Sequence, residues 1–133
     1  MLPVDATTVR LFLHVLAATV WVGGQLTLAG LVPGLRQVSA DAPRAVARRF
    51  DRIAWPAFAV LVVTGIWNLT EVGAPWEGRY GTTLVVKIAV VGASGVSAFL
   101  HAHSRSRRGL AIFGGLSGLT AVSALFLGVA LHG

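Results

Sequence analysis

The sequence predicts an all-α integral membrane protein, and two observations lead to this fold class. Hydrophobic residues make up 55% of the 133 positions and charged residues only 12%, with a mean hydropathy of +0.75. A soluble domain of this size with so few polar residues has too little polar surface to cover itself. Four apolar segments, residues 8–32, 53–70, 81–101 and 110–131, each approach the ~20 residues that a helix needs to cross a bilayer. Because every connection is short, we expect one domain over residues 1–133, an up-and-down four-helix bundle.

The first span is expected to begin after Asp5 or Thr7, either of which can cap a helix, and to end near Pro33 and Gly34. It is too long for a signal peptide, has only Arg10 before its apolar run and shows no convincing cleavage site, so we expect it to be retained. Residues 44–52 predict a short amphipathic helix in the membrane interface. The second span then follows, with Pro56 expected in its first turn, where a missing N–H is tolerated.

The last two spans carry small residues at four-residue spacing. Such faces let membrane helices approach closely, and they make a homo-oligomer plausible as well as a bundle. The residues are Ala89, Ala93 and Ser97 in the third span and Gly114 and Gly118 in the fourth.

The net charge of +6 is distributed unevenly along the chain. The first and third connections are rich in arginine, whereas the second carries Arg79 together with Glu71 and Glu77. The positive-inside rule therefore places the first and third connections in the cytoplasm and both termini outside it. Anionic lipid headgroups account for these arginines, and no nucleic-acid partner is expected. The arginines are Arg36, Arg44, Arg48, Arg49 and Arg52, followed by Arg105, Arg107 and Arg108.

Residue types that the chain lacks exclude several kinds of chemistry. There is no cysteine and the only methionine is Met1, which excludes disulfides and the soft sulfur ligands that Cu(I) prefers. No acidic residue falls within the four segments, and no serine or cysteine nucleophile has a recognisable catalytic partner. Hydrolysis and phosphoryl transfer are therefore not expected, and a bound metal must be held by nitrogen and oxygen.

Two ionisable residues, His14 and Lys87, lie several residues inside predicted spans, away from the span ends. An ionisable group in hydrocarbon is costly and marks a functional site by default. Both helices run inward, and both residues lie about six positions in, which at ~1.5 Å per residue is roughly 9 Å below the outer edge. We therefore expect a site in the outer half of the membrane.

Other polar residues are expected near this depth. The second span brings Thr64 and Asn68 to the outer half, and the fourth ends with His132 at the rim. On the first span, His14, Ala18, Trp21 and Gln25 follow helical spacing and share one face, beside a gap at Gly23 and Gly24 where backbone or a flat ligand can approach. The supporting site residues are thus Lys87, Trp21, Gln25, Asn68 and Thr64, with His14 and His132 as metal or haem ligands.

Each candidate also has a purely structural interpretation. His14 can be satisfied by a backbone carbonyl, and Lys87 can extend to the outer headgroups. His101 and His103 lie at the inner interface beside Arg105, where a solvated pair is expected and an inner metal site is the alternative. His132, the penultimate residue, is expected to be frayed.

Four stretches resemble the copper resistance protein D (CopD) domain family. They are LHVLAATVWVGG at 13–24, RRF at 48–50 with IAWP at 53–56, VTGIWN at 63–68 and YGTTLVVK at 80–87. The resemblance implies copper uptake or homeostasis in the bacterial plasma (inner) membrane, often with a periplasmic copper-binding partner. The residues carried over from the family pattern are His14, Trp21, Thr64, Asn68 and Lys87, and the chain looks like the four-helix core of longer members. Lacking sulfur ligands, it suits a histidine-based Cu(II) site better than a Cu(I) relay.

Two alternatives remain open at this point. The chain is also similar in architecture to the HemJ-type membrane protoporphyrinogen oxidases, which pair a first-helix histidine with a later lysine around haem b. That resemblance implies an oxidoreductase with His14 as axial ligand and Lys87 as second ligand or propionate partner. The other alternative is a small structural membrane subunit whose polar groups only hold helices together.

Overall fold

The computed structural model describes residues 1–73 and 76–133, and these form helices joined by short connections. Four of its continuous helical stretches are long and apolar enough to cross a membrane: Ala6–Val38, Ala42–Val72, Gly78–His103 and Arg107–Ala130. The all-α, multi-span prediction is therefore confirmed for the described part of the chain. The structure divides into two compact units, Met1–Val72 and Gly73–Gly133, which we describe separately.

The first stretch comprises α1 (Ala6–Ala18), a π-helical turn η1 (Thr19–Gly23) and α2 (Gly24–Val38). Asp5 caps α1, as predicted, by accepting a hydrogen bond from the Thr8 backbone N–H at 2.8 Å. This bond holds the pKa of the Asp5 carboxyl below its ordinary value. The predicted end at Pro33 and Gly34 is wrong, because the helix continues through both residues to Val38. Proline and glycine break helices in water but are tolerated within membrane-spanning helices.

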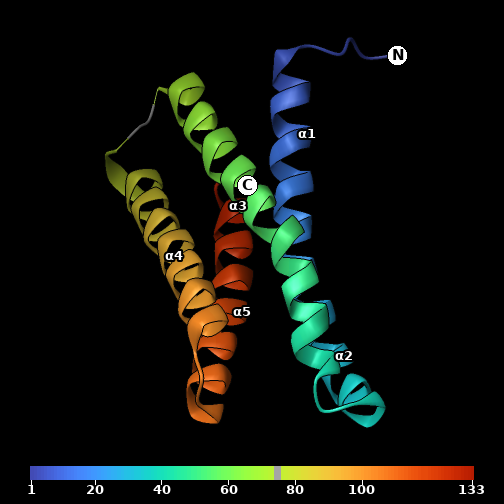
Figure 1. Cartoon of the computed structure of the whole chain (residues 1–133). Coiled ribbons are helices and arrows are strands. Elements are labelled where there is room, and N and C mark those ends of the chain that lie inside the picture. The colour runs from blue at the N-terminus through green and yellow to red at the C-terminus, as the bar shows by residue number, and fades with distance from the viewer. Residues whose placement is uncertain (74–75) are drawn as a thin grey trace. The chain divides into compact units, whose positions relative to one another are not determined.

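The second stretch is a single helix, α3 (Ala42–Val72). The segment 44–52 is helical as expected, but it is the first part of α3 and not a separate interfacial helix. Pro56 consequently lies in the interior of a helix of 31 residues and not in a first turn. A turn at residues 39–41 precedes α3, and the Ser39 hydroxyl accepts the Ala42 N–H at 3.0 Å. Within this unit α3 runs back along α1, as Figure 1 shows.

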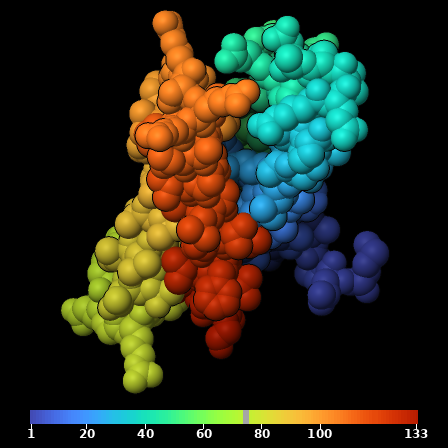
Figure 2. Space-filling model, turned by 90° about the horizontal axis from the view of Figure 1, so that it is seen from below, coloured from blue at the N-terminus to red at the C-terminus, as the bar shows by residue number. Residues whose placement is uncertain are grey.

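The second unit is a helical hairpin of α4 (Gly78–His103) and α5 (Arg107–Ala130). The two helices pack against each other and lie side by side in the space-filling view (Figure 2). Ser94 and Ser117 lie buried between them, and each hydroxyl donates to the other residue's carbonyl, at 3.3 and 3.5 Å. The prediction of a small-residue face holds for Ser97, which is buried, but Ala89 and Ala93 are exposed.

Candidate functional site

His14 is joined to α3 by a hydrogen bond that fixes its tautomer. Its Nδ1 lies 2.8 Å from the Thr64 hydroxyl oxygen, which in turn lies 2.7 Å from the Val60 carbonyl oxygen. A carbonyl only accepts, so the single hydroxyl proton goes to Val60, and the hydroxyl oxygen must accept from His14. The proton of the neutral ring is therefore on Nδ1 and its lone pair is on Nε2. Sequence reasoning placed Thr64 at the depth of His14, and the structure brings the two into direct contact.

The surroundings of the imidazole are small. His14 is half-buried on α1, and the ring edge faces Gly65, where an added Cβ would lie 3.6 Å from Cε1. Thr64 is almost fully buried, with 3% of its surface exposed. The ring is thus held by a buried partner on one nitrogen, and this is the arrangement by which proteins orient histidine ligands for metals.

Trp21 follows His14 by about two helical turns and belongs to an aromatic cluster. Its ring centroid is 5.5 Å from that of Trp55 and 4.5 Å from that of Phe58, and 3% of its surface is exposed. The residue belongs to the π turn, which inserts one extra residue and shifts the helical register below it. The Gln25 side chain donates to the Trp21 carbonyl at 3.0 Å, so it supports this turn. Sequence spacing alone contains no signal for the π turn.

The expected gap at Gly23 and Gly24 is filled in part by the chain itself. The ring of Phe50 from α3 lies so close to Gly24 that an added Cβ would overlap it, whereas a Cβ on Gly23 would meet nothing within 4 Å. Glycine at 24 therefore lets an aromatic ring pack on the helix backbone. The expectation of space for a flat ligand is wrong at this residue.

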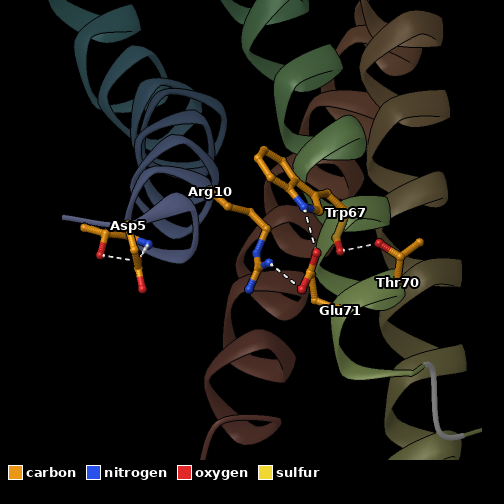
Figure 3. Close-up of polar contacts among 6 residues, drawn as sticks. Asp5, Arg10, Trp67, Thr70 and Glu71 are labelled. Carbon is orange, nitrogen blue, oxygen red and sulfur yellow. Dashed lines mark hydrogen bonds and ion pairs between the residues drawn. The ribbon is translucent and has the colours of Figure 1, made fainter. Parts of the chain in front are cut away.

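A second polar cluster in the same unit lies at the N-terminal end of α1 and the C-terminal end of α3 (Figure 3). Arg10 Nη1 is 3.7 Å from Glu71 Oε2, and its guanidinium lies 5.7 Å from the centre of the Trp67 ring. The Trp67 indole N–H donates to Glu71 Oε1 at 3.3 Å. Arg10 was expected only as a flanking charge. Its position four residues before His14, on the same helical face, is the sequence signal that points to this cluster.

Lys87 belongs to the second unit. It is half-buried on α4, and its side chain lies against α5 where Gly128 leaves room, since a Cβ there would be 3.2 Å from Nζ. Asn68 is half-buried on α3, one turn after Thr64. The structure does not place the two units relative to each other, so the predicted association of Lys87 with His14 stays a prediction.

The remaining histidines are each bonded through Nδ1 to a backbone carbonyl. His101 donates to Leu110 at 2.8 Å and so links α4 to α5, with its ring packed against Gly114. His103 donates to Phe99 within its own helix, and its ring stacks on the Phe99 ring at 4.2 Å between centroids. His132 donates to Gly128 at 2.8 Å. His101 and His103 thus turn to different partners, and among residues 1–73 and 76–133 no three His, Asp or Glu side chains gather as a metal-binding group.

Comparison with known proteins identifies the family. The family model for copper resistance protein D matches residues 44–131, a range that contains Thr64, Asn68, Lys87, His101 and His103 but ends before His132 and begins after His14. No curated protein and no solved structure matches the chain. The match covers most of the sequence and agrees with four helices that can span a membrane, so the protein is a multi-pass membrane protein. The chain therefore belongs to the copper resistance protein D family.

Proposed function

We propose that this protein handles copper ions as its cargo at a site in the outer half of the membrane, with His14 as a ligand through Nε2. Membership of the copper resistance protein D family supports the metal, and the position of His14 six residues into the first span supports the depth. In this proposal the function is copper uptake or homeostasis across the bacterial plasma membrane.

The observation that carries the proposal is the chain of hydrogen bonds from His14 through Thr64 to the Val60 carbonyl. It protonates Nδ1, presents the lone pair on Nε2 and orients the ring, which are the three requirements of a histidine metal ligand. The chain provides nitrogen and oxygen donors and no thiolate, a donor set that suits Cu(II).

The other residues have proposed supporting roles. Lys87, at the same expected depth, would balance the charge of an anionic group near the metal, and His132 at the outer rim would supply a second imidazole. Asn68, one turn beyond Thr64, offers an amide oxygen on the same helical face. A periplasmic copper-binding protein is the proposed partner, and small-residue faces are the basis for proposing self-association.

The test is a metal analysis and an absorption spectrum of the purified full-length protein in mild detergent. We expect stoichiometric copper in the wild type, its loss in His14→Ala and its retention in His103→Ala. His103 is a matched control because its Nδ1 is also hydrogen-bonded, but it is exposed at the C-terminal end of α4. Equal copper in all three proteins would contradict the proposal.

A second candidate function is a haem-b redox protein, because the same Nδ1 bond to Thr64 would orient an axial imidazole equally well. The absorption spectrum separates the two. A Soret band that His14→Ala removes would favour haem, whereas copper without a Soret band favours the first proposal. If the protein contains neither copper nor haem, and His14→Ala leaves the copper sensitivity of the cells unchanged, the histidine only holds helices together.

A further inference from the structure

Five polar residues lie on the facing sides of α1 and α3, from the N-terminal end of α1 as far as His14. We call this set, Arg10 and His14 on α1 with Thr64, Trp67 and Glu71 on α3, the polar seam. Arg10 precedes His14 by one helical turn, and on α3 Trp67 and Glu71 follow Thr64 by one and two turns. The two sets face each other in antiparallel order, since His14 meets Thr64 and Arg10 meets Glu71.

Arg10 has fewer partners than its burial demands. Only 7% of its surface is exposed, and its Nε atom is buried with no hydrogen-bond partner among the described residues. The nearest oxygen of Glu71 is 3.7 Å from Nη1, which is an ion pair but too long for a hydrogen bond. A buried guanidinium whose donors lack acceptors is costly, so this site favours a group that brings oxygen atoms to it.

Glu71 is poorly suited to be the permanent partner. Its side chain is 55% exposed, and its other oxygen accepts a hydrogen bond from Trp67 at 3.3 Å. Figure 3 shows the Arg10 guanidinium extended from α1 toward this carboxylate, with the Trp67 side chain beside them. Because the Glu71 carboxylate is so exposed, it can rotate away from Arg10 and be solvated by water. The edge of the Arg10 guanidinium is then open to another carboxylate, which it can bind through two parallel N–H donors.

The positive charge of Arg10 selects the charge of the copper species that can bind at His14. Side chains four apart on a helix have Cβ atoms about 5–6 Å apart, so Arg10 lies one helical turn from His14 on the same face of α1. A bare divalent copper ion is repelled by the cation of Arg10, whereas a copper complex with a carboxylate ligand is attracted. Within the polar seam Glu71 is the only opposing charge among the described residues, and it is the solvent-exposed member.

We propose that Arg10 forms an anion-binding subsite one helical turn from His14 and that the protein takes copper as a complex carrying a carboxylate group. Before the complex binds, Glu71 occupies the subsite. The carboxylate of the complex then replaces Glu71. This inference rests on the proposed copper function and names its substrate class. Arg10 is a binding residue for the carboxylate in this scheme, and His14 remains the ligand of the metal.

The test compares two copper(II) complexes on the purified full-length protein. One is the negatively charged citrate complex and the other is the neutral bis-glycinate complex, and bound copper is measured after equilibrium dialysis. The ratio of the two apparent affinities is compared among variants, because the affinities of the chelators themselves then cancel. We expect Arg10→Gln to lower this ratio on the order of tenfold, as for the loss of a charged hydrogen bond.

Three further variants distinguish binding from a structural effect. Glu71→Gln frees the guanidinium and is expected to raise the ratio, while Arg10→Lys keeps the charge, loses the paired donors and is expected to give an intermediate value. Arg108→Gln, which removes the same charge from an exposed position of α5, should leave the ratio unchanged. A structural role of the ion pair would make Arg10→Gln and Glu71→Gln change the ratio in the same direction.

The outcomes separate this inference from the function on which it rests. If the wild type binds copper from both complexes and Arg10→Gln leaves the ratio unchanged, the subsite is refuted and the copper function stands. If the wild type binds copper from neither complex, both are refuted. If phosphatidylglycerol abolishes the citrate preference and phosphatidylcholine does not, a lipid phosphate occupies the subsite, and the assignment to a copper complex is wrong.

Discussion

Replacing Thr64 by valine should weaken copper binding far more than it weakens the fold. Valine has nearly the shape of threonine, so it fills the same buried position, of which 3% is exposed, without the hydroxyl. The His14 Nδ1–H then loses its acceptor at 2.8 Å, and the ring is no longer held in one tautomer. Loss of such an orienting partner typically lowers metal affinity by about 10–100-fold, or roughly 1.4–2.8 kcal/mol.

The expected cost to folding is smaller. A polar side-chain contact between membrane helices contributes about 0.6 kcal/mol on average and rarely more than ~1.7 kcal/mol. The affinity is measured by competition with a chelator of known copper affinity, and stability by denaturation in detergent. Thr120→Val is the matched control, because the Thr120 hydroxyl donates to the Leu116 carbonyl at 2.6 Å in the same way but is bonded to no histidine in the described structure.

The reasoning fails if Thr64→Val and Thr120→Val bind copper equally well. It also fails if the loss of affinity in Thr64→Val is matched by an equal loss of folding free energy, since the hydroxyl would then act on the fold and not on the ligand.

Three further predictions test the account at other positions. The pKa of Asp5 is lowered in the folded helix, so its capping contribution is complete above its ordinary value of 3.8 and is lost as the pH falls through the lower folded value. The protection of the first amides of α1, measured against their intrinsic exchange rates at each pH, should fall there, and unchanged protection would contradict this. Gly24→Ala should cost about 1–3 kcal/mol, because its Cβ overlaps the Phe50 ring, while Gly23→Ala has open space and should cost nothing, as thermal unfolding can check. Ser94→Leu should separate α4 from α5 and reduce stability much more than Ser94→Ala, which loses only about 0.6 kcal/mol; similar losses would show that the contact is loose.

Much of the fold could be predicted from hydropathy alone, because a span is defined by about twenty apolar residues whatever their packing partners are. Helix ends were less predictable. Pro33 and Gly34 are strong breakers in water, yet the helix passes through them, and the arginine-rich segment before Pro56 continues α3. Local breaker signals do not include the neighbouring turns that hold a long helix together in apolar surroundings.

The candidate site was predictable in part for the same physical reason. His14 and Thr64 were expected at the same depth, and residues at one depth on neighbouring helices can contact each other. The structure shows such a contact between them. The spacing of Arg10 and His14 is visible in the sequence, but the partners of Arg10 were not predictable from it, because its burial, with 7% of its surface exposed, depends on Trp67 and Glu71 of another helix. The π turn around Trp21 also has no sequence signature, since it adds one residue within an otherwise regular helix.

The most direct test of the central claim is pulsed electron paramagnetic resonance on the wild type, His14→Ala and His103→Ala after each protein has been incubated with Cu(II) and freed of unbound copper. A copper ion bound through Nε2 couples weakly to the remote Nδ1 of the same ring, which gives a recognisable nitrogen modulation. The account predicts this modulation in the wild type and in His103→Ala and its absence from His14→Ala. Bound copper that gives the same modulation in His14→Ala, or none in the wild type, would contradict the assignment of His14 as the ligand.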